Sequence, residues 1–136
     1  MKILMLNYEY PPLGGGAALV SYYILKELAK YNDIEVDLVT SSVDKERVEK
    51  INERVTVYFL DIGKKNKNIH FQTIRDLLSY STKAYAFCKR LIKEKRYDFC
   101  HAFFTVPCGY IALKLKLPFV VSLQGSDVPF YNKRFF

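Results

Sequence analysis

The sequence contains no tryptophan and only three cysteines, Cys88, Cys100 and Cys108, among its 136 residues. The cysteine count is odd and no C-x-x-C pair occurs, so the sequence supports neither a disulfide framework nor a zinc site. Free cysteines are among the most buried residue types. We therefore predict three reduced cysteines in the core and no metal site.

Long apolar runs are also missing, and none approaches the ~20 residues of a membrane span. The opening "MKILMLNY" has a lysine but an apolar run shorter than the ~7–15 residues of a signal-peptide core, and no small-residue cleavage site. It is therefore interpreted as a strand, and we expect an intracellular, cytoplasmic protein. A chain of 136 residues fits one domain.

Acidic residues are scarcer than basic ones, 14 against 21, which gives a net charge of +7. The excess is concentrated in "KKNKN" at 64–68 and in residues 83–96. Such a surface favours phosphates, acidic lipid headgroups or nucleic acid, although a solvated helix face is the alternative. Nucleic-acid binding is disfavoured, because the aromatic residues are dispersed through apolar runs and no helix-turn-helix, zinc or RNP-type signature occurs.

Strand-like and helix-like segments alternate along the chain. Strands are predicted at 2–7, 34–40, 54–61, 97–103 and 117–123, and helices at 20–31, 74–92 and 106–116. The polar segment 44–53 is predicted to be a short exposed helix or a loop. The apolar stripes predicted to face the core are Val20, Ile24, Leu28 and Tyr31 in the first helix, and Ile74, Leu77, Leu78, Ser81, Tyr85, Cys88 and Ile92 in the second.

This alternation predicts the α/β class, specifically a Rossmann-like doubly wound parallel sheet of about five strands with helices on both faces. Right-handed crossovers give the order 3-2-1-4-5 when the strands are numbered along the chain. Ligands of such sheets bind beyond the carboxyl ends of the strands, near the point where the strand order reverses. The segments 8–16, 101–107 and 124–129 are expected there.

Three consecutive glycines, Gly14, Gly15 and Gly16, connect the first strand to the first helix. The loop lacks the GKS or GKT ending of an ATP-binding P-loop and the G-x-G-x-x-G spacing of a dinucleotide fold, which disfavours simple NTPase or NAD chemistry. Its backbone N–H groups and the helix N-terminus could hold an anion. A flexible strand-to-helix turn explains the glycines equally well.

The other two segments carry polar side chains with two interpretations each. His101 is either a ligand-binding residue at a strand end or a hydrogen-bonded packing residue. Gly125 permits a tight turn or close approach of a ligand, and Asp127 is either a cap or a catalytic group. No carboxylate pair, Ser/His/Asp set or metal-ligand spacing occurs.

Taken together, "ILMLNYEYPPLGGGAALVSYYILKELAK", "YDFCHAFFTVPCGYIA" and "LPFVVSLQGSDV" resemble the N-terminal domain of glycosyltransferase family 4, a retaining group with the two-domain GT-B fold. The resemblance implies transfer of a sugar from a nucleotide-sugar to a glycan or lipid-linked acceptor, with no cofactor. It implies a substrate-binding role for Gly14, Gly15, Gly16, His101, Gln124, Gly125, Ser126 and Asp127. Of these, Asp127, Gln124 and His101 are the catalytic candidates.

The chain departs from the family pattern at two positions. Gln124 stands where the family has a histidine, and Phe103 stands where it has the second histidine of the middle motif. A glutamine forms hydrogen bonds but carries no proton at neutral pH.

Residues 1–136 are expected to be the acceptor-side domain without its last strands, and the nucleotide-sugar-binding domain is expected to lie outside the chain. The chain alone is then inactive; the alternative is a non-enzymatic Rossmann-like binding or assembly module. We expect strand 117–123 to be an exposed edge that pairs with a second copy. The basic patches are expected to contact the inner membrane face.

Overall fold

The computed structural model describes residues 1–128, which form one six-stranded sheet with helices on both faces. The strands are β1 (Lys2–Leu6), β2 (Glu35–Ser41), β3 (Arg47–Lys50), β4 (Val55–Leu60), β5 (Phe99–Phe103) and β6 (Phe119–Ser122). The helices are α1 (Gly16–Leu28), α2 (Ile74–Glu94) and α3 (Tyr110–Leu115). A kinked turn, η1 (Thr105–Gly109), in which Val106 is extended, leads into α3.

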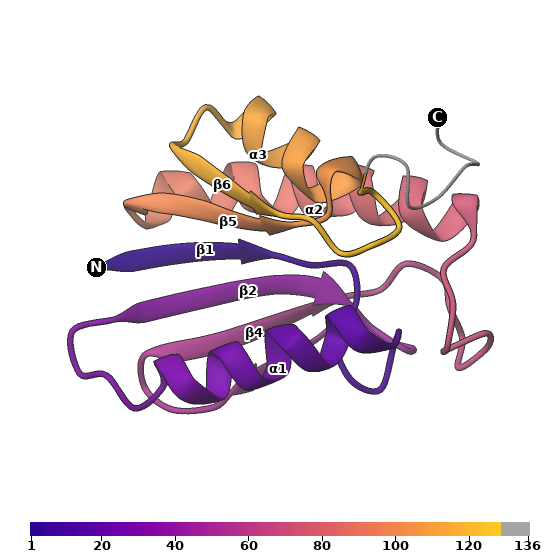
Figure 1. Cartoon of the computed structure of the whole chain (residues 1–136), viewed down its shortest axis with the longest axis horizontal. Coiled ribbons are helices and arrows are strands. Elements are labelled where there is room, and N and C mark those ends of the chain that lie inside the picture. Colours follow the sequence, from indigo (N-terminus) through magenta and orange to yellow (C-terminus); the bar gives the residue numbers. More distant parts are fainter. Residues whose placement is uncertain (129–136) are drawn as a thin grey trace.

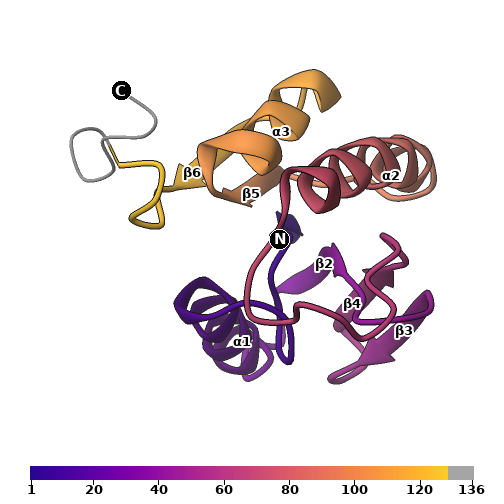
Figure 2. The same ribbon diagram turned by 90° about the vertical axis from the view of Figure 1, so that its right-hand side faces the viewer.

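The strand order is β3-β4-β2-β1-β5-β6, and every neighbouring pair except β3 and β4 is parallel. Helix α1 covers one face, while α2 and α3 cover the other (Figures 1 and 2). Without β3, this is the predicted order 3-2-1-4-5, so the doubly wound prediction is confirmed. The strand order reverses at β1, between β2 and β5, and the loops after β1, β5 and β6 leave from the same edge of the sheet.

The prediction of a short helix or loop at 44–53 is wrong, because β3 lies there. It pairs antiparallel with β4 from Arg47 opposite Phe59 to Lys50 opposite Thr56. All of its residues are exposed, as expected for this segment, and the guanidinium of Arg47 lies 3.6 Å from the ring centre of Phe59. An edge strand without a covering helix stays polar on both faces, so its sequence lacks the alternation that marks a strand.

The faces that the two long helices bury agree with the prediction only in part. Cys88 is buried as predicted, and five other predicted residues pack against the core: Ile24, Leu28, Leu77, Tyr85 and Ile92. Helix α1 buries Ala18, Ser21 and Leu25, whereas Val20 is 43% exposed. Helix α2 buries Asp76, Tyr80, Ala84, Cys88 and Leu91, whereas Ile74 and Leu78 are 79% and 64% exposed. Polar groups reach the core here because they have partners there: the Tyr80 hydroxyl, for example, donates to the Val39 carbonyl at 2.8 Å.

The three cysteines are free and buried, as predicted. Burial raises the pKa of the Cys100 thiol to about 12, so the thiol stays protonated and packs as a small apolar group. Within residues 1–128, no helix combines the length and apolar composition that crossing a membrane requires.

Strand β6 lies at the end of the described sheet, with Phe119 and Val120 40% and 52% exposed. Pairing of this strand with a second copy stays a prediction.

Candidate functional site

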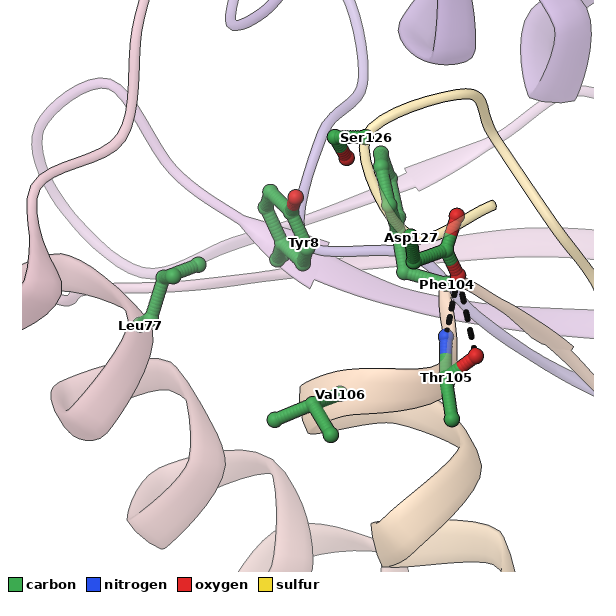
Figure 3. A pocket seen from close by; sticks show the side chains of 7 residues that line it. All are labelled: Tyr8, Leu77, Phe104, Thr105, Val106, Ser126 and Asp127. Atoms are coloured by element: carbon green, nitrogen blue, oxygen red, sulfur yellow. Dashed lines mark hydrogen bonds between the residues drawn. The ribbon is translucent and has the colours of Figure 1, made fainter. Parts of the chain in front are cut away.

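The loops after β1, β5 and β6 surround a cavity of about 290 Å³ at the carboxyl edge of the sheet (Figure 3). Helix α2 closes its remaining side. The lining side chains are Tyr8, Leu77, Phe104, Thr105, Val106, Ser126 and Asp127. Of the site residues predicted from the sequence, Ser126 and Asp127 line this cavity.

Asp127 ties the loop after β6 to the turn after β5. Its Oδ2 accepts hydrogen bonds from the backbone N–H of Thr105 at 2.7 Å and from the Thr105 hydroxyl at 3.0 Å. Its Oδ1 accepts from the Gln124 N–H at 2.7 Å. Both carboxylate oxygens are therefore engaged by the chain itself, as in a capping aspartate.

Two stacked aromatic rings form the floor of the cavity. The rings of Tyr8 and Phe104 lie 4.6 Å apart at 27°. Burial raises the pKa of the Tyr8 hydroxyl, with the nearby Glu9 adding to the effect, so the phenol is a neutral hydrogen-bonding group. Both residues fall in the segments 8–16 and 101–107 that were predicted to lie at this edge, but neither ring was predicted to have a role.

Gly14 is required by the chain's own packing. Its φ is +86°, and a Cβ added to it would lie 2.5 to 2.7 Å from side-chain atoms of Glu9. The Gly14 amide also donates to the Ile69 carbonyl at 2.7 Å. Gly15 and Gly16 have no such constraint, because a Cβ added to either would meet no atom of residues 1–128 within 4 Å. Only the first of the three glycines is thus explained by local packing.

Glu9 lies beside the start of α1. Its Oε2 accepts a long hydrogen bond, 3.4 Å, from the Gly15 N–H. Among residues 1–128, the N-cap of the helix that begins at Gly16 has no side-chain hydrogen bond of its own. Burial raises the pKa of the Glu9 carboxyl, opposed by the Gly15 hydrogen bond. This residue was also missed; the available signal was a carboxylate shortly before a glycine-rich helix start that has no capping side chain.

The segment 62–72 supports the glycine loop, because it contains Ile69. Lys64, predicted to belong to a solvated basic patch, is instead only 4% exposed. Its ammonium donates to the carbonyls of Asn68 and Phe71, both at 2.8 Å, and to Asp76 at 2.9 Å. All three N–H donors of this lysine are used, which explains how a charged group is buried here.

His101 lies inside β5, two residues before the end of the strand, and outside the cavity. Its Nε2 is 2.7 Å from the Ser122 hydroxyl oxygen, and its ring stacks on Phe103 with centres 4.5 Å apart. Burial lowers the pKa of His101, which favours the neutral imidazole.

Gln124 also lies outside the cavity. Its side-chain amide donates to the Ser122 carbonyl at 3.4 Å. Gly125 has a φ of +81°, which agrees with the interpretation that a tight turn requires glycine at this position. Nor is there a candidate metal centre in the described part of the chain, because no three His, Cys, Asp or Glu side chains converge there.

The sequence matches the family described as "Glycosyltransferase Family 4" over residues 14–136. The chain belongs to glycosyltransferase family 4. A search of curated proteins gave no match.

Solved structures share the fold of this family 4 chain at low sequence identity. Sucrose-phosphate synthase from Thermosynechococcus elongatus superposes with a TM-score of 0.64 at 16% identity, over 90% of this chain and 32% of that one. UDP-GlcNAc 2-epimerase from Neisseria meningitidis, solved with UDP-GlcNAc bound, gives a TM-score of 0.55 at 15% identity, over 99% of this chain and 35% of that one. The family 4 chain thus spans about a third of either protein.

Proposed function

We propose that this chain is the acceptor-side domain of a retaining glycosyltransferase that moves a hexose from a nucleotide-sugar to a glycan or a lipid-linked acceptor. Family membership supports the reaction class. The observation that supports this site is the open space beside Gly15 and Gly16, because in the described part of the chain nothing packs where their side chains would lie. Bare backbone at a helix N-terminus suits a diphosphate.

The proposed chemistry is stabilisation of the leaving phosphate by backbone donors. The N–H groups at the start of α1 carry partial positive charge, and donors fixed before the reaction stabilise charge as it develops. Glu9 holds this position in the free chain through its bond to the Gly15 N–H. The Glu9 carboxylate and a diphosphate repel each other. The Glu9 side chain therefore moves aside, or takes up a proton, when a diphosphate binds.

The remaining candidates receive acceptor-side roles. Asp127, with both oxygens engaged by Thr105 and Gln124, shapes the cavity by positioning loops. Ser126 offers a hydroxyl to the acceptor, and Gly125 permits its loop to turn. Gln124 takes the place of the family histidine as a neutral hydrogen-bonding group, and His101 supports it through Ser122.

The nucleotide and donor sugar are proposed to be held mainly by a second Rossmann-like domain outside this chain. The comparison with the epimerase supports this division, since that protein binds a nucleotide-sugar and is about three times as long as this chain. The chain alone is then inactive, no cofactor is needed, and nucleic acid is not a partner.

The exposed basic residues of α2, which include Lys89, Arg90 and Lys93, are proposed to contact the cytoplasmic face of a membrane. The competing function is a non-enzymatic binding or assembly module, in which β6 pairs with a second copy.

A transfer assay on the full-length gene product, with a panel of UDP- and GDP-sugars, tests the reaction. The Gly15→Val variant is expected to lose at least tenfold in kcat/KM, because a branched side chain then stands between the backbone and the phosphate. The matched control is Leu113→Val, at a 58% exposed position on α3 remote from the cavity. Full activity in Gly15→Val, or no transfer with any nucleotide-sugar, contradicts the proposal.

The phosphate contact is tested separately on residues 1–136 by NMR. Adding UDP or GDP is expected to shift the backbone amide signals of residues 15–18 and to leave those of β3, at the far edge of the sheet, unchanged. Shifts confined to the basic face of α2 would instead indicate a non-specific anion surface.

A further inference from the structure

The cavity beside Asp127 has apolar walls. Leu77 enters from α2 and Val106 from η1, and the stacked rings of Tyr8 and Phe104 complete the surface (Figure 3). A bare sugar carries hydroxyl groups around the whole edge of its ring, and each one buried without a partner is costly. The cavity walls are therefore better suited to an alkyl or aromatic group than to a sugar ring.

Most polar groups of the lining are already bonded to each other. The Thr105 N–H and hydroxyl both donate to Asp127, whose other oxygen accepts from Gln124. The Tyr8 and Ser126 hydroxyls remain, and neither forms a hydrogen bond within the described part of the chain. In Figure 3 the Tyr8 oxygen points toward the loop that carries Ser126. Two available hydroxyls at one side of an apolar pocket fit a ligand with a single polar end.

The apolar surface continues outside the cavity. Val106 is 69% exposed, and Ile74 and Leu78 flank Leu77 on the first two turns of α2 with exposed fractions of 79% and 64%. These residues leave room for a carbon chain longer than the cavity itself. A volume of about 290 Å³ lies at the lower end of ligand pockets, which suits a small group of atoms and not a peptide segment.

We propose that this cavity binds the apolar part of the acceptor next to its reacting hydroxyl, so that the acceptor is an alcohol on an alkyl or aromatic carrier. The proposal rests on the function proposed above and narrows its choice between a glycan and a lipid-linked acceptor. Tyr8 and Ser126 contact the hydroxyl end, while Leu77, Phe104 and Val106 contact the carbon chain.

The test compares two ligands that share a polar head. Residues 1–136 are titrated with n-octyl β-D-glucoside, below its micelle concentration, and with methyl β-D-glucoside, while amide signals are followed by NMR. The octyl compound is expected to shift the signals of Thr105, Val106 and Ser126 and to bind at least tenfold more tightly. Burial of two additional methylene groups already corresponds to roughly tenfold in affinity. Equal affinity, or shifts elsewhere only, overturns the proposal.

Three variants locate the binding. Val106→Asp places a charge at an exposed position in the apolar wall. This variant is expected to lower the affinity for octyl glucoside at least tenfold. Leu113→Asp changes a similarly exposed apolar residue outside the cavity. Its affinity for octyl glucoside is expected to stay within twofold of that of the unmodified chain. Tyr8→Phe removes only the hydroxyl and is expected to weaken binding severalfold. If Val106→Asp and Leu113→Asp lose the same affinity for octyl glucoside, the ligand does not bind in this cavity.

A final comparison separates this inference from the glycosyltransferase proposal. In the full-length transfer assay, alkyl or aryl alcohols are expected to be at least tenfold better acceptors by kcat/KM than free sugars. Transfer to free sugars with no such preference overturns the inference and leaves the proposed function standing. Binding of octyl glucoside at Val106 without any transfer overturns the proposed function instead.

Discussion

Lys64 and Asp76 form a buried ion pair: the ammonium nitrogen lies 2.9 Å from Oδ2, and the two side chains are 2% and 12% exposed. The pair joins the segment 62–72 to the first turn of α2. Asp76 also completes the capping box of this helix with Thr73. One ion pair thus stabilises both a helix start and the loop whose Ile69 carbonyl binds Gly14.

Replacing Lys64 with methionine is therefore expected to destabilise the protein by about 3–5 kcal/mol, since removal of one partner leaves a buried charge without compensation. Chemical denaturation in urea measures this loss. The control is Lys67→Met at an exposed position of the same loop, where a change within about 0.5 kcal/mol is expected. Similar losses in both variants would show that the loop, and not the ion pair, is sensitive.

The same pair predicts a pH dependence of stability. Burial raises the pKa of Asp76, but hydrogen bonds from Lys64 and Thr73 outweigh it, so the folded-state pKa lies below the ordinary value. The unfolded chain then binds the proton more readily. The stabilisation is complete above the unfolded pKa of about 3.9 and is lost as pH falls through the lower folded value.

Urea denaturation at a series of pH values checks this direction. Between about pH 5 and pH 3, the free energy of unfolding is expected to fall more steeply in the unmodified chain than in Asp76→Asn, which has no carboxyl group to titrate. Parallel curves would show that other carboxyl groups account for the acid sensitivity.

Gly14→Ala is expected to cost about 1–3 kcal/mol, because alanine is strained at a positive φ and its Cβ clashes with Glu9. Gly16→Ala, at the first residue of α1 with open space around it, is expected to be neutral or to stabilise by up to about 1 kcal/mol. Thermal unfolding followed by circular dichroism compares the two. A larger loss of stability in Gly16→Ala than in Gly14→Ala would contradict the conclusion that packing requires a glycine at position 14 and not at position 16.

Asp127→Ala is expected to destabilise the protein by about 1–2 kcal/mol, since Thr105 and Gln124 lose their shared acceptor. Because this bond joins two loops, faster hydrogen exchange is expected at the Thr105 and Gln124 amides. Ser126→Ala, whose hydroxyl has no partner in residues 1–128, is the matched control and should leave both measurements unchanged. Unchanged exchange in Asp127→Ala would show that the loops are held by other contacts.

The parallel core of the fold could be predicted because strands such as β1 and β4 are buried along nearly their whole length and are therefore largely apolar. Strand β3 could not, since an exposed edge strand has the polarity of a loop. The buried faces of α1 and α2 were predicted only in part, since Val20, Ile74 and Leu78 are exposed. Ser21, Asp76 and Tyr80 enter the core through hydrogen bonds to distant groups, and no helical periodicity indicates such partners.

The candidate site, too, could be predicted only in part from the sequence. Sequence reasoning identified the edge of the sheet, because the ends of the strands define it. It did not identify the side chains that meet there: Leu77 comes from a helix, and the rings of Tyr8 and Phe104 were assigned no role. Lys64 was predicted to be exposed because it belongs to a basic run. Two of its three acceptors are backbone carbonyls, which no residue type indicates, and the third, Asp76, is twelve residues away.

The bond from Gly14 to Ile69 has a consequence for how the chain tolerates changes of length. Surface loops usually accept insertions at little cost, because closure entropy grows slowly with loop length. The segment 62–72 is a surface connection, yet one of its carbonyls must reach a glycine more than fifty residues earlier. A single residue inserted between Lys64 and Ile69 would displace that carbonyl, so the length of this connection is fixed by the glycine loop it supports.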